Sequence, residues 1–279
     1  MFVTRRALAG SRSPLTASLR AQMRFDVEVH RQDLTTLLDD RHDLIVCAVP
    51  GVPLDRDGQV DPEQDHRELI QLARVLSHVR TRHLVVLSTV AVYGELPVAD
   101  ETSDVDAVGG ESWARHRYWF EQKLREHHPS VVVLRVPLVF GSWLQGPSEL
   151  VALERGSMPS GLPLDAALQC YDASRLASDL DRAVSAGLPL VNLVGEPVPA
   201  PELARVCFGT ELAVPALDQT WDRSDGGVST RVRRGTDVRT VHAEVFGGAG
   251  SYVMDRADTI DAVARWARRR SPAAAVGGA

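Results

Sequence analysis

The chain has 279 residues, which is enough for one large domain or for a domain with a lid. Apolar residues make up 44% and charged residues 24%, which is ordinary for a globular enzyme. The net charge is −6 and no basic stripe dominates, which argues against a nucleic-acid-binding protein. Because no window of about 18 apolar residues occurs, we expect no membrane span.

The cysteines indicate a reducing compartment. There are three of them, Cys47, Cys170 and Cys207, and no two are spaced as a CxxC motif. A sparse, odd number favours free thiols in a cytoplasmic protein. No His, Cys or carboxylate spacing is typical of a zinc site, so we expect no metal.

The first fifty residues predict short elements in quick succession. Residues 1–4 are expected to form a short strand, and residues 9–23 a helix with Pro14 in its first turn. Residues 25–29 alternate in polarity like a strand, and residues 34–38 suit a short helix. Residues 43–49 are apolar throughout, which indicates a fully buried parallel strand.

After a polar loop and a helix at 68–79, the chain reaches its most informative stretch. A buried-strand run begins at Leu84, a helix covers 113–126, and a second strand covers 131–135. Strand, helix and strand at this spacing form one βαβ unit of a parallel sheet. Open sheets of this kind bind ligands at the carboxyl ends of their strands.

Beyond residue 141 the chain becomes irregular and rich in glycine and proline. We expect a helix ending near 186, a strand at 188–194, a short helix at 201–208, a loop at 222–236 and a closing helix at 258–269. The predicted division is a core (1–141), the start of a substrate lobe (142–170), a return to the core (171–195), the lobe with its closing helix (196–270) and a disordered tail (271–279).

Two motifs of the central stretch resemble a known family. Residues 88–94 have the sequence Ser-Thr-Val-Ala-Val-Tyr-Gly, and residues 134–141 have Leu-Arg-Val-Pro-Leu-Val-Phe-Gly, with Asp100-Glu101 in the loop between. They resemble the extended short-chain dehydrogenase/reductases, the NAD-dependent epimerase/dehydratase family, whose members mostly act on sugar nucleotides. The resemblance implies an α/β fold of the Rossmann type, with a doubly wound parallel sheet and a small C-terminal substrate lobe.

The N-terminus departs from that family, in which a strand and a glycine-rich G-x-x-G-x-x-G turn open the chain. Here Gly10 is the only glycine before Gly51. Such glycines allow a tight turn and a close approach of the backbone to the cofactor pyrophosphate. Too few residues precede Asp33 to hold both βα units that the family has there, so one unit is shortened or missing.

Two interpretations of this N-terminus are open. On the first interpretation, residues 1–6 form a divergent first strand followed by a degenerate loop. On the second, they form the family's second strand, and the first βα unit is lost. On the second interpretation Arg5 and Arg6 lie where NADP-preferring members keep a phosphate-binding arginine. The cofactor-binding candidates are therefore Arg5, Arg6 and Gly10, and we expect either no cofactor or weakly bound NAD(P).

The resemblance also implies a reaction centre made of a Ser/Thr and a Tyr-x-x-x-Lys pair. Thr89 matches the Ser/Thr position. Tyr118 and Lys123 are five residues apart, about 140° round a helix, so they do not share a face. The better register places Trp113 at the tyrosine and Arg117 at the lysine. An indole cannot act as a base, and arginine does not replace lysine in this role.

Residues in this stretch nevertheless suit a pocket for a small substrate. The catalytic candidates are Thr89, Tyr93 and Arg117, of which Arg117 suits a carboxylate, phosphate or enolate. The substrate-binding candidates are Trp113, Pro137, Trp143 and Asp172. Structural alternatives exist for several of them: Tyr93 and Trp113 as packing residues, Arg117 as an i,i+4 partner of Glu121, and Asp172 as a helix N-cap.

Three functional hypotheses follow. The first is a non-redox enzyme, of isomerase, dehydratase or cyclase type, that acts on a small oxygenated metabolite. The second is an NAD(P)-dependent reductase or epimerase with a nonstandard cofactor loop. The third is a non-catalytic protein that binds a ligand or stabilises a partner. The resemblance further implies a homodimer through the helix that carries Tyr118, Trp119 and Phe120.

Overall fold

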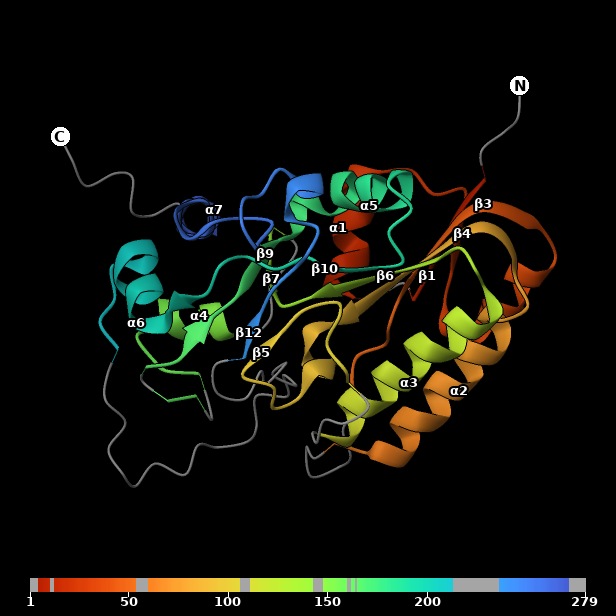
Figure 1. The fold of residues 1–279 in the computed structure, drawn as a ribbon, viewed down its shortest axis with the longest axis horizontal. Helices are drawn as coiled ribbons and strands as arrows, with labels where there is room; N and C mark the ends of the chain where they lie inside the picture. Colours follow the sequence, from red (N-terminus) through yellow and green to blue (C-terminus); the bar gives the residue numbers. More distant parts are fainter. Residues whose placement is uncertain are drawn as a thin grey trace.

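The computed structural model describes residues 5–10, 13–53, 60–105, 111–142, 148–159, 162–163, 165–212 and 236–270. Trp143, almost all of the loop expected at 222–236 and the tail at 271–279 lie outside these residues. The chain folds as an α/β structure in which helices cover both faces of one parallel sheet (Figure 1). The predicted fold class is therefore confirmed.

The sheet has six strands, and every neighbouring pair is parallel. Its central strands are long apolar runs that bury both faces, as parallel sheets between helix layers require. In spatial order the strands are β10 (Leu190–Asn192), β6 (Val131–Val136), β4 (Arg80–Thr89), β3 (Arg41–Ala48), β1 (Arg6–Ala9) and β2 (Val27–Val29).

Two helices cover each face of the sheet (Figure 1). On one face α2 (Pro62–Leu76) packs beside α3 (Ser112–His127). On the other face α1 (Pro14–Gln22) packs beside α5 (Leu176–Ser185). The start of α2 follows from local chemistry, because Asp61 Oδ1 accepts a hydrogen bond from Gln64 N at 2.9 Å and Pro62 occupies the first turn.

The order of the strands decides between the two interpretations of the N-terminus. From β1 the chain moves to β2 on one side and then returns past β1 to β3 and the remaining strands. A strand at this reversal is the first strand of a doubly wound sheet. The first βα unit is therefore present, although without the full glycine fingerprint, and one later unit is missing. The 3₁₀ helix η1 (Arg31–Leu38) connects β2 to β3 directly.

Several element boundaries differ from the predictions. The strand expected at residues 1–4 lies outside the described part of the chain, in which β1 begins at Arg6. Helix α2 begins at Pro62, six residues before the expected 68. The helix expected at 201–208 is divided into α6 (Ala200–Leu203) and a π-helical turn, Ala204–Phe208. These differences lie at element ends, where capping rather than periodicity determines the boundary.

The C-terminal half adds short strand pairs that connect distant parts of the chain. They are β7 (Leu138–Phe140) with β9 (Cys170–Asp172), β8 (Ala167–Leu168) with β11 (Val198–Pro199), and β5 (Val98–Ala99) with β12 (Asp237–Val238). Helices α4 (Glu149–Glu154) and α7 (Arg256–Arg270) and the 3₁₀ turns η3 (Ala173–Arg175) and η5 (Ala243–Phe246) complete this half. The predicted domain boundaries stay a prediction.

Within the described part of the chain, no helix combines the length and the apolar character needed to cross a membrane. The three cysteines are free thiols. Of the aromatic residues expected to pair two copies, Phe120 is fully buried, whereas Tyr118 and Trp119 are half-buried. Dimer formation through this helix stays a prediction.

Candidate active site

The carboxyl ends of the parallel strands meet at one edge of the sheet. Gly10 follows β1, Pro50 follows β3, Thr89 ends β4, Pro137 follows β6 and Asn192 ends β10. The order of the strands reverses between β1 and β3, so ligands of such folds bind beside Gly10 and Pro50. This edge is the candidate site.

The backbone at position 10 leaves no room for a side chain, so a glycine is required there. Its φ is +84°, in the left-handed region that side chains disfavour. A Cβ at this position would lie 2.5 Å from the carbonyl oxygen of Ala48, at the end of β3. Gly10 therefore keeps the role of the first fingerprint glycine, which is to allow the turn between β1 and α1.

The next two fingerprint positions hold small hydroxyl residues, which the sequence analysis missed. In the register G-x-x-G-x-x-G that begins at Gly10, the other two positions are Ser13 and Thr16. Ser13 Oγ accepts the N–H of Thr16 at 3.1 Å, and Thr16 Oγ1 donates to the Ser13 carbonyl at 2.8 Å. Here a side chain caps the helix at the place where a glycine would admit a phosphate.

This cap reduces what α1 can offer to a cofactor. A pyrophosphate at such a site accepts hydrogen bonds from the first N–H groups of the helix. Pro14 has no N–H, and the N–H of Thr16 is taken by Ser13, so two of the three residues 14–16 cannot donate. The turn geometry fits a dinucleotide, but the donor groups do not.

Arg5 and Arg6 lie at the opposite edge of the sheet. Both precede or begin β1, so they are at its amino end, a strand's length from Gly10. The Arg5 guanidinium pairs with Asp40 at 2.7 Å, and the backbone N–H of Arg6 donates to Asp26. This placement does not favour their assignment as cofactor-binding residues, because ligands of such folds bind at the carboxyl ends of the strands.

Trp113 and Arg117, which the sequence resemblance predicts at the family's Tyr and Lys positions, are both buried in α3. Arg117 Nη1 lies 2.5 Å from each carboxylate oxygen of Asp65 on α2. Its Nη2 donates to the Pro50 carbonyl at 2.9 Å, at the end of β3. The expected i,i+4 pair with Glu121 is wrong, because that carboxylate belongs to a second ion pair.

The second ion pair joins α3 to β6. Arg135 Nη2 lies 2.5 Å from Glu121 Oε2, and both side chains are almost fully buried. The Ser88 hydroxyl donates to Glu121 Oε1, which connects the end of β4 to the same network. The Arg135 guanidinium also lies 4.8 Å from the ring centroid of Tyr93. This network fills the space between α3 and the sheet.

Tyr93 is a buried residue of that network. It is 1% exposed, and its hydroxyl donates to Asn192 Oδ1 at 3.1 Å and accepts from Asn192 Nδ2 at 2.8 Å. Burial raises the pKa of the phenol, although Arg135 and the bond to Asn192 act in the opposite direction. At neutral pH the phenol is therefore protonated, and it is poorly placed to take a proton from a ligand.

Among the remaining candidates, Thr89 is half-buried and Pro137 is buried. The Thr89 hydroxyl accepts the N–H of Ala91 at 3.1 Å. Asp172 is the N-cap of η3, since its Oδ1 accepts the N–H of Ser174 at 2.9 Å, which confirms the structural alternative. Lys123 pairs with Glu126 on the surface, so it does not form a reaction centre with Tyr118.

Glu101 connects the candidate site to the C-terminal half. Its Oε1 accepts the N–H of Asn192 at 2.7 Å and the hydroxyl of Thr240 at 2.6 Å. Its Oε2 accepts the N–H of Val241 at 2.9 Å. One carboxylate thus holds the loop after β4, the end of β10 and the segment after β12 together.

The sequence contained signals for both buried ion pairs. Asp65 stands at the start of the apolar stripe that continues with Leu69, Leu72 and Leu76, and Arg135 lies within a run of buried β-branched residues. A charge at a core position needs an opposite charge nearby. Among the residues that the structure describes, no group of three His, Cys, Asp or Glu side chains could hold a metal ion.

No protein-family model and no curated protein matches the sequence. Solved structures do match. A dTDP-4-dehydrorhamnose reductase from Clostridium acetobutylicum has a TM-score of 0.69 at 13% identity, over 96% of this chain and 100% of that one. RMD from Pseudomonas aeruginosa, solved with NADPH, has 0.65 at 15%, over 96% and 100%. WbmG from Bordetella bronchiseptica, solved with NAD and UDP, has 0.66 at 16%, over 95% and 94%.

The similarity covers nearly the whole of every chain compared. The fold is that of the extended short-chain dehydrogenase/reductases. The sequence resemblance predicts Trp113 and Arg117 at the Tyr and Lys positions of the family's reaction centre; both are buried here, and Arg117 is half of an ion pair. At such low identity the similarity extends to the fold, and the chemistry must be argued from the site.

Proposed function

We propose that this protein binds a small oxygenated metabolite, of the sugar-derived kind, at the carboxyl edge of its sheet and acts on it without transferring hydride. Isomerisation and elimination are the reaction classes that fit, because both move protons without a redox cofactor. Solved structures of the same fold include a dTDP-4-dehydrorhamnose reductase and a protein in complex with UDP, which supports a sugar-nucleotide-like ligand.

One observation supports the non-redox part of the proposal. Arg117 stands where the family's lysine would stand, and both Asp65 and the Pro50 carbonyl accept its guanidinium hydrogen bonds. A side chain held in this way does not reach out to a nicotinamide ribose. Beside it, Trp113 offers no group that can accept a proton. The side-chain cap on α1 weakens the phosphate site in addition.

Of the three catalytic candidates, Thr89 has the best position for contact with a ligand. It ends β4 at the candidate site and is half-buried rather than enclosed. Tyr93 and Arg117 act on a ligand only indirectly, because neighbouring side chains occupy their polar groups. We therefore assign substrate contact to Thr89 and Pro137, and positioning to the two buried residues.

A second candidate function is an NAD(P)-dependent reductase or epimerase. The left-handed Gly10 and its close contact with Ala48 favour it, because this is the turn that dinucleotide-binding folds need. On this alternative, groups other than the first N–H groups of α1 donate hydrogen bonds to the pyrophosphate.

Calorimetric titration separates the two functions. The purified protein is titrated with NAD⁺, NADH, NADP⁺ and NADPH, and separately with UDP- and dTDP-linked sugars. The proposal expects no dinucleotide binding at millimolar concentration and measurable binding of at least one nucleotide sugar. Micromolar binding of any dinucleotide would support the reductase instead.

A matched pair of variants tests the site. Thr89→Val removes the hydroxyl at constant shape and should weaken binding of the nucleotide sugar about tenfold, as expected for one lost hydrogen bond to a ligand. Thr102→Val, on the exposed loop after β5, should leave binding unchanged. The predicted homodimer is checked in the same preparation by light scattering at micromolar concentration, where a monomeric mass would contradict it.

A further inference from the structure

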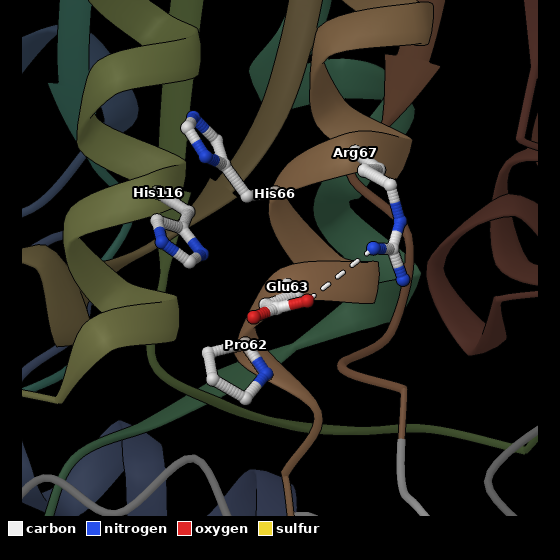
Figure 2. Close-up of a pocket in the computed structure, with 5 residues that line it drawn as sticks. All are labelled: Pro62, Glu63, His66, Arg67 and His116. Carbon is white, nitrogen blue, oxygen red and sulfur yellow. Dashed lines mark ion pairs between the residues drawn. The ribbon is translucent and has the colours of Figure 1, made fainter.

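A pocket lies between the first turns of α2 and α3. It is an open cavity of about 400 Å³ lined by Pro62, Glu63, His66, Arg67 and His116. Figure 2 shows His66 on α2 and His116 on α3 on one side of the pocket, while Glu63 and Arg67 form an ion pair along α2. We call it the α2–α3 pocket.

The two imidazoles of this pocket form an ordered stack. Their ring centroids are 4.7 Å apart and the planes differ by 13°. Trp119 packs edge-on against His66 at 5.2 Å. Both histidines are half-buried, so the stack has a fixed geometry and remains accessible.

His116 is also connected to the interior. Its Nδ1 lies 2.8 Å from Asp65 Oδ2, and Asp65 in turn pairs with Arg117. Arg117 donates to the Pro50 carbonyl at the carboxyl end of β3. A continuous series of charge-assisted hydrogen bonds therefore runs from the α2–α3 pocket to the edge of the sheet that holds the candidate site.

We propose that the α2–α3 pocket binds a small oxyanion, a phosphate or carboxylate group, and that this binding is coupled to the end of β3 through His116, Asp65 and Arg117.

The charges around the pocket favour an anion. The carboxylates of Asp65 and Glu63 are already paired with Arg117 and Arg67, so the two imidazoles are left as the groups that respond to a ligand. Because Nδ1 of His116 faces Asp65, Nε2 is the ring nitrogen that remains for a ligand. When the ring is doubly protonated, that nitrogen donates to an oxyanion. His66 and His116 are each the fifth residue of a helix, so they lie at the same level of the two packed helices.

Nuclear magnetic resonance of the full-length protein, labelled at histidine rings and backbone amides, tests this inference. The probes are inorganic phosphate and acetate, with chloride at equal ionic strength as the reference, in a slightly acidic buffer. We expect saturable shifts of the His66 and His116 ring signals with phosphate or acetate but not with chloride. The stronger of the two probes identifies the ligand class. The Gly51 amide, next to Pro50, should shift in parallel.

Two variants complete the test. His66→Gln leaves the bond between His116 and Asp65 in place and should weaken oxyanion binding about tenfold. His127→Gln, at the exposed end of α3, should leave it unchanged. Equal shifts with chloride, or a His127 ring that responds as strongly as His66, would overturn the site. Ring shifts without any Gly51 shift would overturn the coupling. None of these results depends on whether the carboxyl edge binds a nucleotide sugar.

Discussion

Arg117 and Asp65 are 52 residues apart in the chain, yet Arg117 Nη1 lies 2.5 Å from both carboxylate oxygens of Asp65. Their side chains are only 3% and 2% exposed. The pair joins the two helices on one face of the sheet. Arg117, which the sequence resemblance predicts at the position of a catalytic lysine, takes part in the packing of α2 on α3.

Removing one partner should therefore cost stability. We expect Asp65→Ala to lower the free energy of unfolding by about 3–5 kcal/mol, because it leaves the Arg117 charge buried without a counter-charge. Denaturant unfolding followed by circular dichroism measures this. Replacing both residues, Asp65→Leu with Arg117→Met, should recover most of the loss. If Asp65→Ala costs no more than Arg67→Ala on the exposed surface, the pair has no structural role.

The identity of Ser13 should control access of phosphate to α1. Ser13→Gly frees the Thr16 N–H and should strengthen NAD(P) binding, at a cost of only a few tenths of a kcal/mol. Ser13→Ala also removes the cap, but it costs about 1 kcal/mol and leaves a Cβ in the path of the pyrophosphate. Calorimetric titration and thermal unfolding measure both effects. Equal dinucleotide affinity in the two variants would show that the cap does not limit binding.

Glu101 should hold the segment after β12 against the end of β10. Glu101→Gln keeps the shape but removes the charge from a group that accepts three hydrogen bonds. We expect hydrogen exchange at the Val241 and Asn192 amides to become roughly tenfold faster or more. The surface variant Glu126→Gln is the control. Unchanged exchange at both amides would mean that other contacts suffice to hold this segment.

His42 should make stability depend on pH. It is 2% exposed, and neither ring nitrogen has a hydrogen-bond partner. Burial, and then the charge of Arg5, lower the pKa of this imidazole. As pH falls below about 6.5 the unfolded chain takes up a proton there and the folded chain does not, so the free energy of unfolding decreases. The decrease ends once the pH reaches the folded-state pKa.

His42→Leu should flatten this part of the stability curve, measured by urea unfolding at several pH values. The pKa of His83 is also lowered by burial, so a smaller slope from that residue should persist. The exposed His127→Gln variant should keep the full slope. An identical slope in His42→Leu and the unaltered protein would contradict the assignment.

Much of the fold was predictable because it rests on local patterns. The apolar runs of β3, β4 and β6 and the apolar stripe of α2 follow directly from residue periodicity, and the helix between β4 and β6 follows from their spacing. The position of β1 was not predictable in this way. Its four residues are too few to show a pattern, and only pairing with β2 and β3 selects them.

The candidate site was predictable only in part. The strand ends that meet at the edge, including Thr89 and Pro137, follow from the βαβ arrangement. The partners of the buried charges cannot be predicted from this arrangement, because Asp65 and Arg117 come together only when two helices pack on the same face of the sheet. The cap at Ser13 has a sequence signal of its own, because Ser followed by Pro is typical of a helix start. This signal is independent of the missing fingerprint glycines.

The two outermost strands of the sheet, β2 and β10, are three residues long each, whereas the strands β3 and β4 inside have eight and ten. A long free edge is a template on which another chain can add a strand. Edges of three residues offer only one or two unpaired backbone groups of each kind. The absence of one βα unit after β1 therefore leaves only a short strand, β2, at that edge of the sheet.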